Sequence, residues 1–391
     1  MRVGMRRALI VFMLLGLVSL FADITYEGAT SIRGGYLYLI GATAVVAGFV
    51  RVGEIVNYFT RFLSGLLGDY FKSSKTLWGL VIIGYAINVV AIPLLAFARR
   101  WEEVLALVIL ERMGKGLRAP ARDVILSEVS EEMGKGLGFG IHEFLDQFGA
   151  FSGPLIASII LLKTGGDYGS AFIALGFPGL VAVGFATSSM ILYPNLKTFN
   201  LSKRSVGIRG LGKTFYIYLA GLMIMSVGFL SWDLFTFSIK SEGIVGDEII
   251  PLFYTVAMLI DGLVAIPIGI LYDKIGVSSI ISAPVALIVS TLFLSPRAEL
   301  LFVYSAIWGF VMGVFETNVR VAVSDIVNPV QRSLAYGVFG LFYGFSLMIG
   351  GLIQGAVYSW GFSYLKALIV VSETISIVIF SYLAYSLLRK Q

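Results

Sequence analysis

The sequence predicts an all-α membrane protein in which twelve transmembrane helices form two pseudo-symmetric six-helix bundles. Of the 391 residues, 58% are hydrophobic and only 14% are charged, whereas soluble domains carry about 25% charged residues. Long apolar runs and 14% aromatic residues exclude an intrinsically disordered chain. Because one helix needs about 20 apolar residues to cross a bilayer, the hydrophobic residues suffice for about eleven or twelve spans and little else.

Twelve apolar segments follow one another along the chain, and the longest polar connection divides them six and six. The segments cover residues 8–28, 38–62, 76–98, 102–125, 138–162, 168–193, 214–239, 248–271, 277–295, 299–322, 333–358 and 363–388. The basic connection predicts an N-terminal bundle (1–195), a cytoplasmic linker (196–213) and a C-terminal bundle (214–391). Asp23 and Glu27, and not a small-residue cleavage site, follow the apolar stretch from Ala8 to Ala22, so we interpret it as a membrane helix and not a signal peptide.

The distribution of basic residues predicts the orientation. An even number of spans places both termini on one side of the membrane. The connections on that side hold roughly twice as many lysines and arginines as those on the other side. Because such residues concentrate in cytoplasmic loops, we expect a multi-pass protein of the cell (inner or plasma) membrane with both termini in the cytoplasm.

Residues that the chain lacks exclude several functional classes. It has no cysteine, which excludes disulfides and thiolate metal sites, and its one histidine, His142, cannot build a histidine-rich metal cage. It contains no Walker sequence for ATP and no nucleophile–base constellation of a hydrolase. We therefore expect no enzymatic activity and no cofactor, and we attribute the net charge of +5 to topology and not to a nucleic-acid partner. After these exclusions, transport driven by an ion gradient is the functional class that remains.

An internal repeat supports the division into halves. The stretch Gly65-Leu-Leu-Gly-Asp69 recurs as Gly269-Ile-Leu-Tyr-Asp273, and Ser127-Glu128 recurs as Ser324-Asp325. Two six-helix halves of parallel orientation are the arrangement of major facilitator transporters, whose substrates bind near the membrane midplane.

The repeated stretch resembles the first signature of the major facilitator superfamily, Gly-x-Leu-x-Asp-Arg-x-Gly-Arg-Lys. The first copy, in the short loop expected after the second helix, keeps the glycine and the aspartate but replaces the arginines, and its basic residue lies at Lys75. The second copy keeps the pattern as far as Gly276. The resemblance implies that Asp69 and Asp273 clamp neighbouring helix ends on the cytoplasmic side, and that the protein is a monomer.

Two further motifs indicate a branch of that superfamily. Gly149-x-x-x-Gly153-Pro154 is similar to the signature of exporters and antiporters, although small residues at this spacing also serve close helix packing. The stretch from Arg118 through Pro120 to Arg122 and Asp123, followed by Phe139-Gly-x-His142-x-x-x-Asp146, resembles a prokaryotic subgroup commonly assigned to drug or metal-ion efflux.

Ionisable residues at membrane depth are functional candidates because each costs at least a few kcal/mol unless it faces a partner or a wet cavity. Asp23 and Glu27 share one face of the first helix, where a carboxylate pair can hold protons or a cation. Arg51 either pairs with Glu54 in its own helix or faces Asp23. Arg112 resembles the arginine that exporters carry in the fourth helix, which implies a role in proton coupling. These five residues are the expected proton-coupling set.

Charges in the fourth and fifth helices predict a gate. We expect His142 and Asp146 to pair with Arg118 or Arg122 across these helices, although both arginines can instead snorkel to the membrane surface. The expected gating and conformational residues are Asp69, Asp273, Arg118, Arg122, Asp123, His142, Asp146, Gly149, Gly153 and Pro154. Glu111 and Lys115 are expected to pair one turn apart.

Acids and aromatic residues of several helices are expected to line the substrate site. These are Asp23, Tyr26, Glu27, Asn57, Trp232, Asp233, Asp261, Trp308 and Glu373. An excess of acids together with aromatic rings favours a cationic or amphiphilic substrate, through charge pairing and cation–π contacts.

The predicted function is secondary active transport by alternating access, with proton-coupled export of a small cationic or amphiphilic molecule. One alternative is export of a divalent metal ion, with Asp23, Glu27 and Asn57 as hard oxygen ligands. The other belongs to a different class, a membrane sensor or lipid-handling module without gradient-driven transport.

Overall fold

A computed structural model describes residues 2–131, 135–196, 211–328 and 331–389, and these residues are helical apart from short connections. The helices are α1 (Arg2–Leu39), α2 (Ala44–Phe49), α3 (Val52–Phe71), α4 (Ser74–Leu94), α5 (Trp101–Val129), α6 (Lys135–Thr164), α7 (Tyr168–Leu192), α8 (Lys213–Gly228), α9 (Trp232–Ser241), α10 (Ile250–Ile275), α11 (Ser282–Ser290), α12 (Ala298–Val314), α13 (Arg320–Ile326), α14 (Arg332–Tyr358) and α15 (Phe362–Leu388). Short turns of tighter or wider helix, η1 (Leu95–Phe97), η3 (Gly276–Ile281) and η4 (Phe315–Val319), extend or join them.

The helices follow the twelve predicted segments, three of which are interrupted. The second consists of α2 and α3, the seventh of α8 and α9, and the tenth of α12, the π-helical turn η4 and α13. Nine stretches of the described residues are long and apolar enough to cross a membrane. The helices α3 and α5 are not among these stretches because they contain more charged residues. Ile250–Ser290 counts as one stretch because η3 joins α10 to α11.

The chain forms two compact units. The first unit contains Met1–Arg33, Val56–Lys203 and Asp247–Thr255, and the second contains Gly34–Ile55, Arg204–Gly246 and Val256–Gln391. Each unit therefore takes a short segment from the other half of the sequence, because α1, α3 and α10 each divide between the two units. The predicted linker lies for the most part outside the described residues, which resume at 211.

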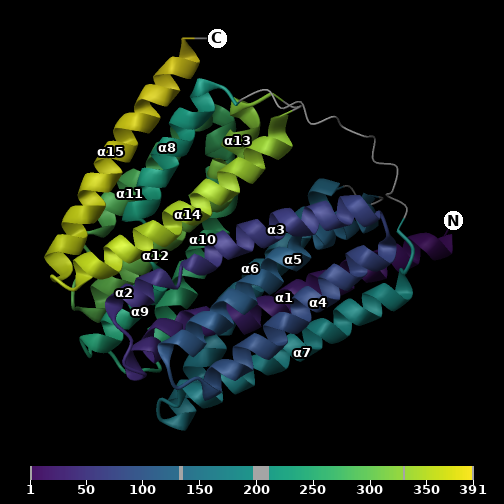
Figure 1. Cartoon of the computed structure of the whole chain (residues 1–391), viewed down its shortest axis with the longest axis horizontal. Coiled ribbons are helices and arrows are strands. Elements are labelled where there is room, and N and C mark those ends of the chain that lie inside the picture. The colour runs from purple at the N-terminus through teal and green to yellow at the C-terminus, as the bar shows by residue number, and fades with distance from the viewer. Residues whose placement is uncertain (1, 132–134, 197–210, 329–330, 390–391) are drawn as a thin grey trace. The chain divides into compact units, whose positions relative to one another are not determined.

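In the first unit α4 packs against α5 and α7, and α6 packs against α7 (Figure 1). Glycines allow α4 and α5 to approach each other closely, since a methyl group at Gly84 of α4 would lie 2.7 Å from the carbonyl oxygen of Gly114 on α5. The helix α7 begins at an N-cap, where the Asp167 carboxylate accepts from the backbone N–H groups of Gly169 and Ser170. A hydrogen bond from the Ser170 hydroxyl and these backbone donors lower the pKa of Asp167 below its usual range.

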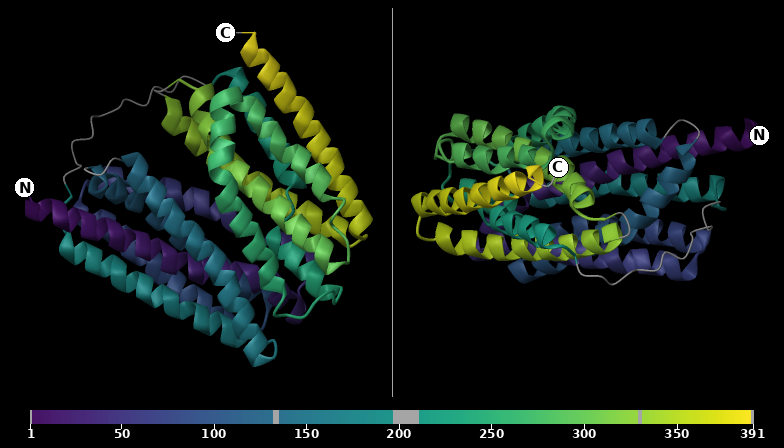
Figure 2. Two further views of the ribbon diagram at one scale, coloured as in Figure 1. Left: turned by 180° about the vertical axis from the view of Figure 1, so that it is seen from behind. Right: turned by 90° about the horizontal axis from the view of Figure 1, so that it is seen from above.

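In the second unit α8 packs against α14 and α15, and α2 packs against α14 (Figure 2). Small residues again form the seam, because a side chain at Gly48 or Gly351 would collide with the backbone of the other helix. The core between these helices contains fully buried aromatic side chains, including Tyr218, Phe215 and Phe380.

The repeated glycine–aspartate stretch lies in helices and not in loops. Gly65 to Asp69 belong to the last turns of α3, and Gly269 to Asp273 belong to the last turns of α10. The expectation of a loop at the first copy is therefore wrong. The helix continues because its apolar residues Leu66, Leu67 and Phe71 extend the exposed apolar surface of α3.

Candidate functional site

Two polar stripes face each other inside the first unit. On α1, Ser19, Asp23 and Glu27 follow at intervals of four residues and share one face. On α5, Lys115, Arg118 and Arg122 follow with the spacing of one helix face. The stripes run in opposite directions: Ser19 contacts Arg122, Tyr26 contacts Arg118, and Glu27 contacts Lys115. Helical periodicity thus brings acids and cations of distant segments together at membrane depth.

Asp23 is buried where α6 lies against α1. A methyl group at Gly149 would lie 2.9 Å from the Asp23 Cβ atom, and one at Gly153 would lie 2.5 Å from the Ile24 carbonyl oxygen. The exporter-like glycine pair therefore serves as a packing seam that places the α6 backbone beside Asp23. Only 5% of Asp23 is exposed, and in the described part of the chain no cation lies within ion-pair distance of its carboxylate.

Glu27 joins three segments of the first unit. Its Oε1 atom lies 3.8 Å from the Lys115 Nζ atom, and its Oε2 atom accepts a 2.7 Å hydrogen bond from the Tyr254 hydroxyl. Tyr254 lies in the first turns of α10, in the segment that the second half of the sequence contributes to this unit. The same segment is fixed by the Tyr168 hydroxyl, which donates to Asp247, and by the Ser158 hydroxyl, which donates to the Glu248 carbonyl oxygen.

Arg118 is held by aromatic rings. Its guanidinium carbon lies 5.4 Å from the ring centre of Tyr26 and 4.4 Å from that of Tyr85, and only 2% of the residue is exposed. Among the described residues the Arg118 Nη1 atom has no hydrogen-bond partner. The side chain is buried, and among the described residues it forms no ion pair with Asp146. Tyr26 also receives Lys115, whose Nζ atom lies 4.4 Å from the ring centre.

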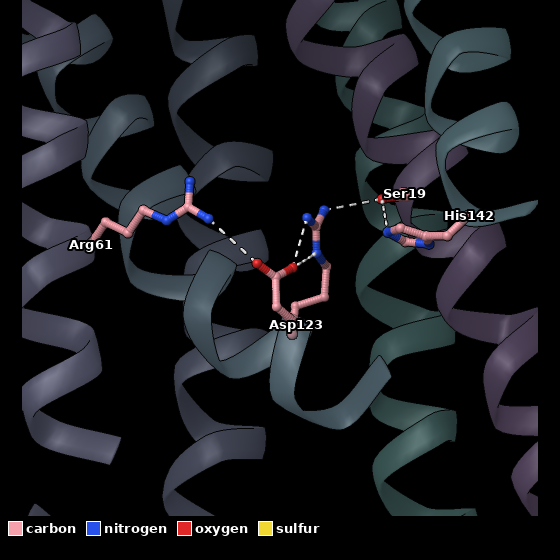
Figure 3. A network of polar contacts seen from close by, with 5 residues as sticks. Ser19, Arg61, Asp123 and His142 are labelled. Atoms are coloured by element: carbon pink, nitrogen blue, oxygen red, sulfur yellow. Dashed lines mark hydrogen bonds and ion pairs between the residues drawn. The ribbon is translucent and has the colours of Figure 1, made fainter. Parts of the chain in front are cut away.

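A chain of polar contacts connects α3, α5, α1 and α6 (Figure 3). Asp123 accepts from Arg61 at 3.4 Å and from Arg122 at 3.1 Å, and Arg122 also donates to the Ser19 hydroxyl at 3.3 Å. Ser19 lies 3.2 Å from His142 Nε2, with the direction of that bond set by the histidine tautomer. The structure thus joins Arg122 to His142 through Ser19.

Asp146 lies one turn after His142 on α6. Ser19, Arg122 and His142 are its interacting neighbours, so it belongs to the same polar chain. Its Oδ1 atom has no hydrogen-bond partner among the described residues.

Glu111 and Lys115 do not form the pair that their spacing predicts. Glu111 accepts from Asn88 of α4 at 3.3 Å, and its Oε2 atom lies 3.2 Å from the Arg112 Nε atom. Lys115 pairs with Glu27 instead. Glu111 thus contacts Asn88 on α4 and the adjacent Arg112, and Lys115 contacts Glu27 on α1, in place of the expected i, i+4 pair.

In the second unit, Arg51 binds a break between α8 and α9. Its guanidinium donates to the carbonyl oxygens of Phe229 at 2.6 Å and of Leu230 at 3.2 Å, and lies 5.2 Å from the Phe229 ring centre. Gln354 of α14 donates to the carbonyls of Val227 and Phe229 and accepts from the Ser231 N–H. These side chains replace the backbone hydrogen bonds that the break removes, which an apolar environment requires.

The expected substrate-wall tryptophans pack in an aromatic cluster around this break. Trp308 donates to the Leu230 carbonyl at 3.0 Å and stacks on Phe229, with ring centres 4.9 Å apart. Trp232 lies 4.8 Å from Trp308, edge to face, and each of the two is 4% exposed. The remaining members of the cluster are Phe235, Tyr304, Phe315, Phe339 and Tyr343.

The other predicted substrate residues divide between the units. Asn57 lies on α3 in the first unit, whereas Asp233, Asp261 and Glu373 are buried in the second, on α9, α10 and α15. Glu54, at the start of α3, belongs to the second unit with Arg51. Within the described residues, no three His, Asp or Glu side chains lie close enough to hold a metal ion.

The proposed clamp aspartates are exposed, and tyrosines at the ends of α10 and α7 donate to the acids of the sequence repeat. Asp69 and Asp273 lie on the surface of their units. The Tyr272 hydroxyl donates to Asp325 at 2.8 Å, and the Tyr193 hydroxyl donates to Glu128 at 3.0 Å. Glu128 and Asp325 are the acids of the sequence repeat, so both halves use this acid as a tyrosine acceptor.

Sequence reasoning missed several residues of these networks, chiefly Ser19, Tyr85, Asn88, Tyr254 and Gln354. Ser19 continues the four-residue spacing of Asp23 and Glu27, so a search for polar stripes would have found it. The tyrosines and the amides give no such signal, because their partners lie far away in the sequence.

Comparison with known proteins identifies the family. The family model described as Major Facilitator Superfamily matches residues 222–390. An uncharacterized protein of Mycobacterium bovis is 33% identical over 371 residues, which cover 93% of this chain and 90% of the relative. An uncharacterized MFS-type transporter of Methanocaldococcus jannaschii is 27% identical over 365 residues, which cover 90% of this chain and 88% of the relative. The match to the Major Facilitator Superfamily model lies in the C-terminal part of the chain, and a relative named as an MFS-type transporter aligns with nine tenths of it.

Solved structures of transporters share the fold. The nucleoside transporter NupG superimposes with a TM-score of 0.76 at 15% identity, covering 95% of this chain and 98% of NupG. A bacterial homologue of the human lysosomal transporter Spinster gives a TM-score of 0.70 at 14% identity, covering 97% of this chain and 96% of that structure. Family and fold together make the chain a multi-pass membrane transporter of a small molecule or ion, and not an enzyme.

Proposed function

We propose that this major facilitator transporter exports a small cationic or amphiphilic molecule in exchange for protons, with the carboxylates of α1 as the proton sites. The observation that carries the proposal is the pair of facing stripes on α1 and α5 within the first unit. Acids at membrane depth that face cations or each other are typical of proton relays in transporters.

The two carboxylates have different surroundings and are assigned different roles. Glu27 is bound by Lys115 and by Tyr254, so protonation of Glu27 would weaken the contact that holds the start of α10 in the first unit. Asp23 is buried beside α6 and lacks a cation at ion-pair distance among the described residues. A proton and a cationic substrate can therefore compete for the Asp23 carboxylate, which is the basis of antiport.

Export is supported by the position of the exporter-like motif. Gly149 and Gly153 bring the backbone of α6 against α1 at Asp23 and at Gly28. The motif and the proposed proton site thus share one helix interface, so a change at Asp23 acts directly on the α1–α6 seam. We assign cell-membrane location and cytoplasmic termini on the distribution of basic residues.

The gate that we propose is the polar chain from Arg61 through Asp123, Arg122 and Ser19 to His142. It joins four helices of the first unit. Separation of α3 from α5 or of α5 from α1 breaks a charge-assisted hydrogen bond, and such bonds are stronger than neutral ones. Separation of α6 breaks the contact between Ser19 and His142. The chain therefore favours one arrangement of the four helices.

Transport in inside-out membrane vesicles tests the proposal. Respiration acidifies the vesicle lumen, and a pH-sensitive dye reports protons that leave when tetraphenylphosphonium is added outside. We expect proton efflux together with uptake of the cation by vesicles that contain the protein. Asp23→Asn combined with Glu27→Gln should reduce both signals to the level of vesicles without the protein.

A matched variant controls for general effects of removing an acid. Glu299 is exposed in the first turn of α12, and Glu299→Gln should leave both signals unchanged. Proton efflux on addition of Zn²⁺ or Mn²⁺ but not of the organic cation would replace the proposed substrate with a divalent metal. Cation uptake that is insensitive to the pH gradient, or unchanged by the double substitution, would contradict proton coupling through α1.

A further inference from the structure

The second unit contains a carboxyl group that has no partner. Glu373, in the middle of α15, is 0% exposed, and neither carboxyl oxygen has a hydrogen-bond partner in the described part of the chain. Burying a carboxylate without a cation or hydrogen bonds costs far more than burying a neutral polar group. Such a side chain therefore requires a bound positive ion or a proton.

The end of helix α8 surrounds this carboxyl group. Gly228 is the last residue of α8, and a methyl group there would collide with the Glu373 Oε1 atom and lie 2.5 Å from the Ser372 hydroxyl oxygen. The glycine thus leaves room for two oxygen atoms beside the helix end. The C-terminal end of a helix carries partial negative charge, which makes an anionic carboxylate less favourable at this place and a cation more favourable.

Among the described residues, the elements packed against α15 carry their basic side chains far along the helix from Gly228, which lies against Glu373, and from Gly350. Neither α11 nor η3 contains a titratable residue, and those of α8, Lys213, Tyr216 and Tyr218, lie in its first two turns. On α14, Gly350 packs against α8 at Ser226, and the flanking titratable residues are Tyr343 and Tyr358. Lys366 lies two turns before Glu373 on α15 itself.

The remaining charges near the break belong to other contacts or have the wrong sign. Arg51 donates to the carbonyl oxygens of Phe229 and Leu230. Asp233, in the first turn of α9, is an acid. The Glu373 site therefore combines a carboxyl, a hydroxyl and a helix C-terminus, all of which favour a small positive ion.

We propose that Glu373, with Ser372 and the C-terminal end of α8, forms a binding site for a monovalent cation, either a proton or Na⁺. Ends of interrupted helices bind coupling cations in other transporter folds, and hydroxyl and carboxylate oxygens suit both ions. The proposal is separate from proton exchange at α1, because it concerns a different unit and makes no assumption about the substrate. Occupation of the site stabilises the break between α8 and α9.

Infrared spectroscopy of the full-length purified protein tests the site directly. The wild type and Glu373→Gln, which preserves the shape of the side chain, are compared from about pH 5 to about pH 9 in choline chloride and in NaCl. A C=O band of a protonated carboxylic acid, present in the wild type in choline and lost in the variant, supports a bound proton. Replacement of that band by a carboxylate signal in NaCl, with a higher unfolding temperature, supports Na⁺.

Absence of both signals would overturn the proposal. A difference spectrum with neither a carboxylic acid band in choline nor a change on addition of NaCl would mean that Glu373 binds neither ion. The Ser372→Ala variant adds a second measurement, since loss of the hydroxyl should shift the pH at which the acid band disappears or weaken the response to NaCl. An unchanged spectrum in Ser372→Ala would remove Ser372 from the site.

A double-mutant cycle keeps the test decisive if a single variant folds poorly. Gly228→Ala should lower the unfolding temperature of the wild type more than that of Glu373→Ala, because the shortened side chain no longer collides with the new methyl group. Gly269→Ala in α10 is the control, since nothing lies within 4 Å of a methyl group there. Equal effects of Gly228→Ala in both backgrounds would contradict the placement of the carboxyl.

The two proposals fail separately. Loss of proton-coupled transport in the α1 variants would leave the Glu373 spectrum unchanged, and absence of a Glu373 signal would leave transport through α1 standing.

Discussion

The two units satisfy buried polar groups in different ways. The first unit matches charged side chains with one another, as in Glu27 with Lys115 and Asp123 with Arg122. The second unit uses backbone carbonyls and aromatic rings. Arg51 donates to the carbonyls of Phe229 and Leu230 at the helix break, and Trp308 also donates to the Leu230 carbonyl. Charge pairs respond to protonation, whereas carbonyl contacts do not, and this difference is why we propose that transport is coupled to protons through the first unit.

The repeat shows what the halves retain in common. Glu128 and Asp325 occupy equivalent positions, and each accepts from a tyrosine, Tyr193 in one unit and Tyr272 in the other. These contacts lie at helix ends, and there both units use the same kind of contact, a tyrosine hydroxyl that donates to a carboxylate. The units differ in their buried polar contacts, which are mainly charge pairs in the first unit and contacts to backbone carbonyls in the second.

The largest expected effect concerns the α1–α6 seam of the first unit. Gly153→Ala would place a methyl group 2.5 Å from the Ile24 carbonyl oxygen and 2.8 Å from the Gly28 nitrogen, and backbone atoms cannot yield as side chains do. We expect a loss of about 3 kcal/mol in stability, the upper part of the range for overpacking. Gly140→Ala on the same helix, where nothing lies within 4 Å, should leave the unfolding temperature unchanged. Equal unfolding temperatures for the two variants would contradict the seam.

The next effect tests the backbone contacts of the second unit. Gln354→Leu leaves the Val227 carbonyl and the Ser231 N–H without their partners, and we expect a loss of about 2 kcal/mol because unsatisfied buried polar groups are costly. Chemical unfolding in detergent measures the change. Thr374→Val on the exposed face of α15 serves as the control. A neutral effect of Gln354→Leu would show that the break does not depend on this amide.

A smaller effect is expected from the contact between Tyr254 and Glu27. Tyr254→Phe removes the hydroxyl that donates to Glu27 at 2.7 Å, and a hydrogen bond of this kind contributes about 1 kcal/mol or somewhat more. Thermal unfolding should therefore show a modest loss of stability. Tyr364→Phe, in which the ring is largely exposed, is the matched control, and the prediction fails if the two variants behave alike.

The smallest effect concerns the cap of α7, outside the membrane-spanning part. Asp167→Ala should cost about 1 kcal/mol or less at neutral pH. Because hydrogen bonds lower the pKa of the Asp167 carboxyl, its contribution is present at neutral pH and is lost as the pH falls through that lowered value. The difference in unfolding temperature between wild type and variant should shrink from about pH 6 to about pH 3. A difference that stays constant would contradict a role of the charged form.

The sequence predicts the helical segments well and their contacts poorly. A helix is predicted over residues 168–193 and is observed over Tyr168–Leu192, because the helix begins and ends where the long apolar run does. The second segment is predicted at 38–62, but α1 continues to Leu39 and Gly41 adopts a positive φ of 78°. Thr43 then caps α2, and α3 follows and ends at Phe71. Hydropathy locates apolar segments, but it does not show that a helix continues beyond its apolar part.

Interruptions and partners depend on residues that are distant in the sequence. The break after Gly228 has no signal of its own, because the groups that satisfy its carbonyls, Arg51 and Gln354, lie on other segments. Spacing correctly places Asp23 and Glu27 on one face, but it cannot identify Tyr254 as a partner of Glu27. Periodicity defines a face of a helix, and only the fold determines what that face meets.

The most direct test of the central claim is proton release from the purified protein in detergent on addition of tetraphenylphosphonium, measured with a pH indicator in weakly buffered solution. Competition at α1 predicts release by the wild type and by Glu299→Gln, which removes an exposed acid of α12, and no release by Asp23→Asn combined with Glu27→Gln. Undiminished release by the double variant would contradict proton coupling in the first unit.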